Sequence, residues 1–149
     1  METNKLIEKL ISLKVLTPGD YSNVSETKLI ALLEKSGKVP IFEIDVESIE
    51  NNWDYARLFS NLLELVTPEI DVTRIRSKLD REHRVSRISF VLKGKKLEWK
   101  FTQISDFVSD EFIDAISELI STESSGELVL LQKGDPYLYV FYLPDSGFV

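Results

Sequence analysis

The chain of 149 residues is 43% hydrophobic and 29% charged, which is typical of one soluble globular domain. It contains no cysteine, which excludes disulfides, thiolate metal sites and cysteine nucleophiles. The formal net charge of -7 disfavours general affinity for polyanions, and it is consistent with a basic protein partner or with solubility alone. The sequence begins without a signal-like segment, and no stretch approaches the roughly 20 apolar residues of a membrane span, so we expect a cytoplasmic protein.

The first 40 residues are predicted to form a pair of short helices. Apolar residues recur with helical spacing over about residues 4–15, and the pattern stops before Pro18, which resists helix continuation. A second helix is expected to begin near the cap-like residue Asn23 and to end at Gly37.

A short strand and a third helix are predicted next. Residues 41–46 alternate between polar and apolar side chains, as a half-buried strand does. Asn51 or Asn52 is expected to cap a helix that ends at Thr67-Pro68. The apolar stripe of this helix places Trp53 most simply in the core. The stripe consists of Trp53, Ala56, Phe59, Leu62, Leu63 and Val66.

Three alternating segments in the middle of the chain predict an antiparallel meander. They are residues 73–79, 86–92 and 95–102, and the dipeptide Lys93-Gly94 is a two-residue hairpin signal between the second and the third.

A fourth helix, over about 109–122, and a C-terminal hairpin of strands 127–132 and 137–143 complete the prediction. This order of elements indicates an α+β fold with an antiparallel sheet packed with helices, and not a βαβ repeat. We expect the whole chain to form a single domain, with an N-terminal helical subregion at 1–40 and an α+β core at 41–149.

The hairpin loop determines which residues face each other across the meander. With Lys93 and Gly94 in the loop, one face is apolar, and the other pairs Arg87 with Lys100. Matching the faces of the preceding strand places Lys78 beside Arg87. Like charges directly opposite each other destabilise a sheet. Either an anionic group of the same chain or of a partner lies over this row, or the side chains extend into water, where their repulsion is screened.

The same face carries most of the basic residues of this part of the chain. Ten of the 18 basic residues fall between Arg74 and Lys100. Sheets that bind RNA interleave aromatic residues with cations, whereas the aromatic residues here fall on the opposite face. We therefore rank nucleic acid below protein as a partner. The alternative function is an anion or nucleic-acid binding module that uses Arg74, Arg76, Lys78, Arg87, Lys96 and Lys100.

Four acidic residues lie near one side of the fourth predicted helix. Such spacing can serve acid–base chemistry or magnesium binding, but it is more often the outer face of an amphipathic helix. No common catalytic, nucleotide or metal motif occurs, and His83, the only histidine, lies in a predicted turn. We expect no enzymatic activity, no cofactor and no metal. We expect these acids to bind a partner protein: Asp110, Glu111, Asp114 and Glu118.

The last predicted strand is apolar on both faces, which is typical of a central, buried strand. If one face were exposed, its aromatic residues could anchor a protein partner. The buried interpretation is the simpler one. The two faces consist of Tyr137, Tyr139 and Phe141, and of Leu138, Val140 and Tyr142.

Several segments between residues 53 and 144 carry a resemblance to other proteins. They include Trp53-Asp54-Tyr55-Ala56, Phe90-Val91-Leu92, Trp99-Lys100-Phe101, Asp106-Phe107-Val108 and Leu143-Pro144. In them the chain resembles a group of small acidic bacterial proteins, some of them similar to immunity proteins of toxin systems. The resemblance implies a non-enzymatic protein that occludes a toxin, with a basic toxin domain as its partner. It carries no catalytic residue to this chain, since the shared positions are mostly in the core.

Overall fold

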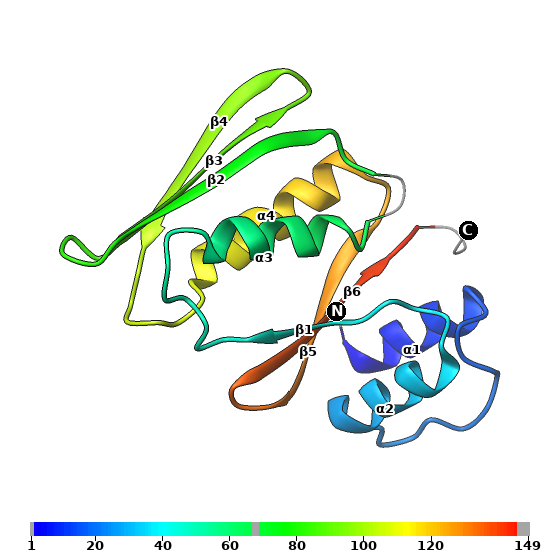
Figure 1. Ribbon diagram of the computed structural model, residues 1–149. Helices are drawn as coiled ribbons and strands as arrows, with labels where there is room; N and C mark the ends of the chain where they lie inside the picture. Colours follow the sequence, from blue (N-terminus) through cyan, green and yellow to red (C-terminus); the bar gives the residue numbers. More distant parts are fainter. Residues whose placement is uncertain (1, 67–68, 146–149) are drawn as a thin grey trace.

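The computed structural model describes residues 2–66 and 69–145, which form an α+β fold, as predicted (Figure 1). Within these residues there are four helices and two three-stranded antiparallel sheets, with strand orders β1-β6-β5 and β2-β3-β4. The meander and the C-terminal hairpin therefore belong to separate sheets. The elements are α1 (Thr3–Ser12), α2 (Glu26–Ser36), β1 (Phe42–Asp45), α3 (Asp54–Leu63), β2 (Val72–Asp80), β3 (Val85–Leu92), β4 (Lys95–Thr102), α4 (Asp110–Glu123), β5 (Glu127–Gly134) and β6 (Tyr137–Leu143).

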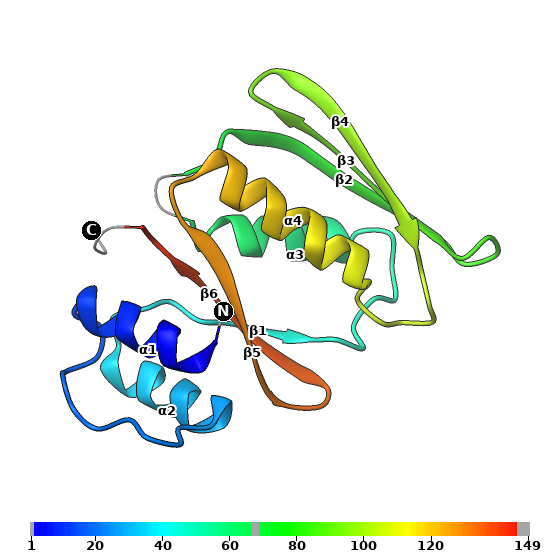
Figure 2. The same cartoon turned by 180° about the vertical axis from the view of Figure 1, so that it is seen from behind.

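The elements stack in four layers (Figures 1 and 2). Helices α3 and α4 lie between the two sheets, and helices α1 and α2 cover the other face of β1-β6-β5. The outer face of β2-β3-β4 is covered by no helix of the described part of the chain. None of the described helices is long and apolar enough to cross a membrane.

Strand β6 joins the two hydrophobic cores because it is apolar on both faces. Val140 and Tyr142 pack into the core around α3 and α4, while Phe141 and Leu143 pack into the core beneath α1 and α2. β6 is also the central strand of its sheet, between β1 and β5. The predicted burial is confirmed for these residues, whereas Tyr137, at the start of the strand, is 43% exposed.

Helix α3 corrects the prediction for Trp53, which is 55% exposed. The helix begins at Asp54, and its buried face is formed by Tyr55, Phe59 and Leu62 at helical spacing. Trp53 precedes this stripe by two residues and therefore projects from another side of the helix. The helix ends at Leu63, with Glu64 as its C-cap, and so does not continue to the predicted end at Thr67-Pro68, two residues that lie outside the described part of the chain.

Two predicted helix caps are also wrong. Asn52 does not cap α3, because its Oδ1 accepts a hydrogen bond from the Leu79 N–H (2.9 Å). Ser25, and not Asn23, caps α2 by accepting a bond from the Lys28 N–H (3.1 Å). Adjacent Asn and Ser residues are all good caps, so sequence alone does not choose among them. Gly37 ends α2 in the left-handed conformation (φ 64°), as predicted.

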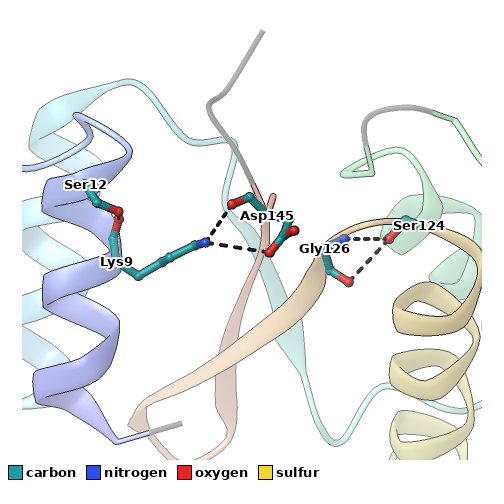
Figure 3. Close-up of polar contacts among 5 residues, drawn as sticks. All are labelled: Lys9, Ser12, Ser124, Gly126 and Asp145. Carbon is teal, nitrogen blue, oxygen red and sulfur yellow. Dashed lines mark hydrogen bonds and ion pairs between the residues drawn. The ribbon is translucent and has the colours of Figure 1, made fainter.

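Two sets of polar contacts lie at one end of sheet β1-β6-β5, where β5 begins and β6 ends (Figure 3). Lys9 on α1 donates through Nζ to the main-chain oxygen of Asp145 (2.7 Å), which follows β6. Ser124, after α4, accepts a hydrogen bond from the Gly126 N–H (3.2 Å) just before β5. Helices α1 and α4 are thereby tied to this end of the sheet as well as through their apolar faces.

The register of the β2-β3-β4 sheet is the predicted one except in β2 between Thr73 and Arg76, where a bulge shifts it. Lys78 pairs with Arg87, and Arg87 pairs with Lys100. All three side chains are exposed, and no acidic helix or loop of the described chain lies over them. Glu98, in the same sheet, lies 3.4 Å from the guanidinium of Arg87, so the row is solvated, with one acid beside it.

A buried polar network fixes the loop between β4 and α4. The Tyr55 hydroxyl donates to Oε1 of Gln103 (2.6 Å) and accepts from the Ser109 N–H (2.9 Å). Oε1 of Gln103 also accepts from the Ser86 hydroxyl (3.0 Å), and its Nε2 donates to the Phe107 carbonyl (2.7 Å). Among the described residues, no buried side-chain nitrogen or oxygen lacks a hydrogen-bond partner. The network joins α3, β3, β4 and the start of α4.

Replacement of Tyr55 by Phe tests this network. The variant leaves the Ser109 N–H without its partner and removes one of the two hydroxyls that donate to Oε1 of Gln103, so the free energy of unfolding at neutral pH should fall by about 1–3 kcal/mol. Urea denaturation of the two proteins measures the difference. A change of less than about 0.5 kcal/mol would show that the network contributes little.

The same variant has a predicted pH dependence. Burial raises the pKa of Tyr55 from its ordinary value of 10.0 to about 12, because apolar surroundings disfavour the phenolate. The native state then keeps this proton where the unfolded chain loses it, so the contribution to stability is complete below pH 10.0 and is lost as the pH rises toward 12. The wild type should lose more stability than Tyr55→Phe over this range. Parallel pH curves would contradict the assignment.

Candidate functional site

A groove of about 460 Å³ lies where the loop between β4 and α4 meets the β5–β6 turn. The end of β1, this loop and the turn lie at the same end of the molecule (Figure 2). The Val46 N–H donates to the Pro136 carbonyl (2.8 Å), and the Val46 carbonyl accepts from the Val108 N–H (2.7 Å). These main-chain bonds join three segments that are distant in the sequence, so the groove belongs to the folded core and not to one loop.

The groove gathers the exposed apolar side chains of the protein. In residues 2–66 and 69–145, four large hydrophobic residues are exposed, and three of them line the groove. They are Ile104 (67% exposed), Phe107 (43%) and Tyr137 (43%), and the fourth, Trp53, lies elsewhere. Single exposed hydrophobic residues are ordinary, but a convergent group in a concave site is typical of a binding surface.

The rim of the groove is acidic. Asp110 and Glu111, in the first turn of α4, and Asp135, in the β5–β6 turn, line it. Both helix residues follow the cap Ser109, whose hydroxyl accepts from the Glu111 N–H (3.2 Å). The capped N-terminus thus presents two carboxylates beside the apolar lining, where the helix dipole stabilises them.

Asp114 and Glu118 extend this acidity along α4. They follow Asp110 at intervals of four residues and therefore lie on the same side of the helix. All four acids of α4 that the sequence singled out are exposed. The buried side of the helix carries Phe112 and Ile116. In the part of the chain that the structure describes, these four acids form no ion pair with a basic residue. Residues 104–149 contain nine acidic residues and one basic residue, Lys133. The groove and this side of α4 therefore form one surface, which we call the acidic groove surface.

The predicted cationic residues lie on another layer. The outer face of β2-β3-β4 carries Arg76, Lys78, Arg87, Lys96 and Lys100, and Arg74 lies in the same sheet. The acidic and basic sets are therefore not brought together in one site.

Sequence reasoning missed the apolar part of the groove. Ile104 and Phe107 lie in a segment that was expected to be a connecting loop, and Tyr137 was expected to be buried with its strand. The available signal was two large apolar residues within four positions of a polar loop. Because the walls come from three separate segments, their convergence is a property of the fold.

The described residues include no group of metal-binding side chains, and their one histidine is outside the groove lining. No three His, Asp or Glu side chains among them lie close enough to hold a metal ion. His83 is exposed, lies 2.9 Å through Nδ1 from Asp80 in the β2–β3 turn, and does not line the groove. The chemistry that the groove supports is recognition of a group with an apolar body and a positive charge.

Benzamidinium, an apolar ring with a cationic end, tests this recognition. We expect saturable changes in the amide NMR shifts of residues 104–111, 135, 137 and 138, with a dissociation constant on the order of millimolar. Benzoate has the same ring and the opposite charge and should leave these shifts unchanged. Equal responses to both compounds, or shifts confined to other elements, would contradict the assignment.

Comparison with known proteins adds no residue to this site. The chain matches no family model, no curated protein and no solved structure. The resemblance of residues 53–144 to small acidic bacterial proteins therefore stays a prediction from the sequence.

Proposed function

We propose that the protein is a non-enzymatic binding protein that neutralises a basic protein, in the manner of an immunity protein that occludes a toxin. The observation that carries the proposal is the joining of exposed apolar side chains and uncompensated carboxylates in one surface. The apolar residues Ile104, Phe107 and Tyr137 lie directly beside Asp110 and Glu111. The proposal places this activity in the cytoplasm.

The two parts of the surface have different energetic roles. Large apolar and aromatic residues that become desolvated supply most of the binding free energy of a protein interface. Charges at the rim steer the partner, raise the association rate and select against partners of the wrong sign. A basic active-site cleft would satisfy both requirements, because its cations meet the acids while its walls cover the groove.

The acidic groove surface is large enough for such a partner. Helix α4 has 14 residues and is therefore about 21 Å long. Together with the groove at its N-terminus, the exposed side of α4 approaches the size of a standard interface, which buries about 800 Å² on each partner.

Co-expression tests the proposal. A toxic protein encoded by a reading frame next to this one in its genome is produced together with this protein. We expect growth to be restored and a complex to be recovered, and the captured partner to carry a basic surface. If growth is not restored and no complex is recovered, the proposal is contradicted. An acidic partner surface would contradict the role assigned to the carboxylates.

Neutralisation of the four helix acids tests their part in binding. The quadruple variant should weaken the complex by about tenfold or more, mainly through slower association, and the loss should shrink at high salt. A matched control removes four exposed carboxylates elsewhere and should bind within about twofold of wild type. Equal losses would show a net-charge effect only. The test set is Asp110→Asn, Glu111→Gln, Asp114→Asn and Glu118→Gln, and the control set is Glu8→Gln, Glu34→Gln, Glu64→Gln and Glu127→Gln.

Replacement of Phe107 by Ala tests the apolar anchor. The side chain is 43% exposed, and Gln103 holds the main chain of this residue, so the variant should fold normally. We expect its affinity for the captured partner to fall by about 2 kcal/mol, chiefly through faster dissociation. Trp53→Ala, a second exposed aromatic residue outside the groove, should bind like wild type. If both variants bind equally well, Phe107 is not an anchor.

A further inference from the structure

Strand β2 contains a bulge that changes the cationic face. Thr73 pairs with Val91 and Arg76 pairs with Ser89, so two residues of β2, Arg74 and Ile75, stand opposite a single residue of β3. Arg74 adopts a left-handed backbone conformation (φ 54°), which is uncommon for a residue other than glycine. Bulges of this kind bend a strand and redirect a side chain.

A hollow of about 400 Å³ lies beside the bulge in the sheet. Arg74, Arg76 and Lys96 line it, with the partly buried residues Ser89 and Val91 between them. Ile75, the other extra residue, packs against the core instead. Arg74 therefore lines the hollow from the bulge itself, together with Arg76 and Lys96.

The cations of the hollow are uncompensated. Glu98 also lines the hollow, but its Oε1 lies 3.4 Å from the guanidinium of Arg87, outside the hollow. Arg74, Arg76 and Lys96 form no ion pair in the described portion of the chain. The hollow therefore differs from the row of Lys78, Arg87 and Lys100, where a carboxylate already lies beside the central cation.

We propose that this hollow binds a compact oxyanion of the phosphate class. Two guanidinium groups offer forked donors that match the oxygens of a phosphate, and the ammonium of Lys96 adds a point charge. A doubly charged anion between three cations relieves their mutual repulsion, which a single carboxylate would do less completely. The partly buried Val91 beside the anion lowers the local dielectric and strengthens each contact.

The neighbouring residues favour an isolated anionic group over a nucleic-acid strand. The aromatic side chains of β3 and β4, which could stack on bases, belong to the core or pack against it. The overall charge of -7 also opposes the approach of a long polyanion. The proposal is independent of the acidic groove surface, which lies on other elements.

Titration with inorganic phosphate, followed by NMR at constant ionic strength, tests the hollow. The wild type should show saturable shifts at residues 74–76, 89–91 and 96–98, with a dissociation constant on the order of millimolar. The variant Arg74→Gln/Arg76→Gln should bind about tenfold or more weakly. Lys78→Gln/Lys100→Gln removes the same two charges from the same face and should bind within about threefold of wild type. O-phosphoserine and AMP, titrated in the same way, distinguish a phosphoprotein from a nucleotide as the source of the group.

Three results would overturn the proposal. They are the absence of saturation up to about 50 mM phosphate, an equal loss of binding in both double variants, and shifts that map to other elements. The single variant Lys96→Gln leaves the bulge intact and should also weaken binding, so it keeps the test decisive if Arg74→Gln/Arg76→Gln is unstable. Unchanged phosphate affinity in Lys96→Gln would count against the site.

Discussion

The hydrogen bonds of the buried Gln103 amide are the contacts on which the geometry of the acidic groove surface depends. Oε1 of Gln103 receives the hydroxyls of Tyr55 and Ser86, and its Nε2 holds the carbonyls of Ser105 and Phe107. One side chain thereby ties helix α3 and strand β3 to the loop that carries the exposed residues of the groove. A loop that is held from beneath can present apolar side chains to solvent without collapsing onto the core, which reduces the ordering cost when a partner binds.

The layered fold keeps two surfaces of opposite charge apart. Strand β6 is buried between the two cores. Helices α3 and α4 lie between the two sheets, and α4 exposes its acidic side. The cationic residues occupy the outer face of β2-β3-β4, at the edge of the stack. The net charge of -7 therefore does not describe how charge is distributed over the surface of the molecule. Separation of this kind allows one protein to bind a basic protein and a small anion at independent sites.

Turn residues and the spacing of apolar and charged residues in the sequence predicted strand pairing, strand burial and the exposed side of α4. The loop at Lys93-Gly94 determined the pairing of Arg87 with Lys100, and the apolar faces of β6 indicated its central position. The acids of α4 were placed on the exposed side by their spacing. The N-terminal caps of α2 and α3 were wrong because neighbouring residues compete for the cap position, and Trp53 was wrong because the buried face of α3 begins at Tyr55. The groove and the bulge at Arg74 depend on contacts between distant segments, which no local pattern contains.

Cross-linking of the recovered complex tests the central claim, that the acidic groove surface is the binding surface. A carbodiimide joins carboxylates directly to amines that lie within ion-pair distance. Mass spectrometry should find the cross-links at Asp110, Glu111, Asp114 and Glu118, joined to lysines of the partner. Cross-links confined to carboxylates on α1, α2 or the β2-β3-β4 sheet would contradict the account.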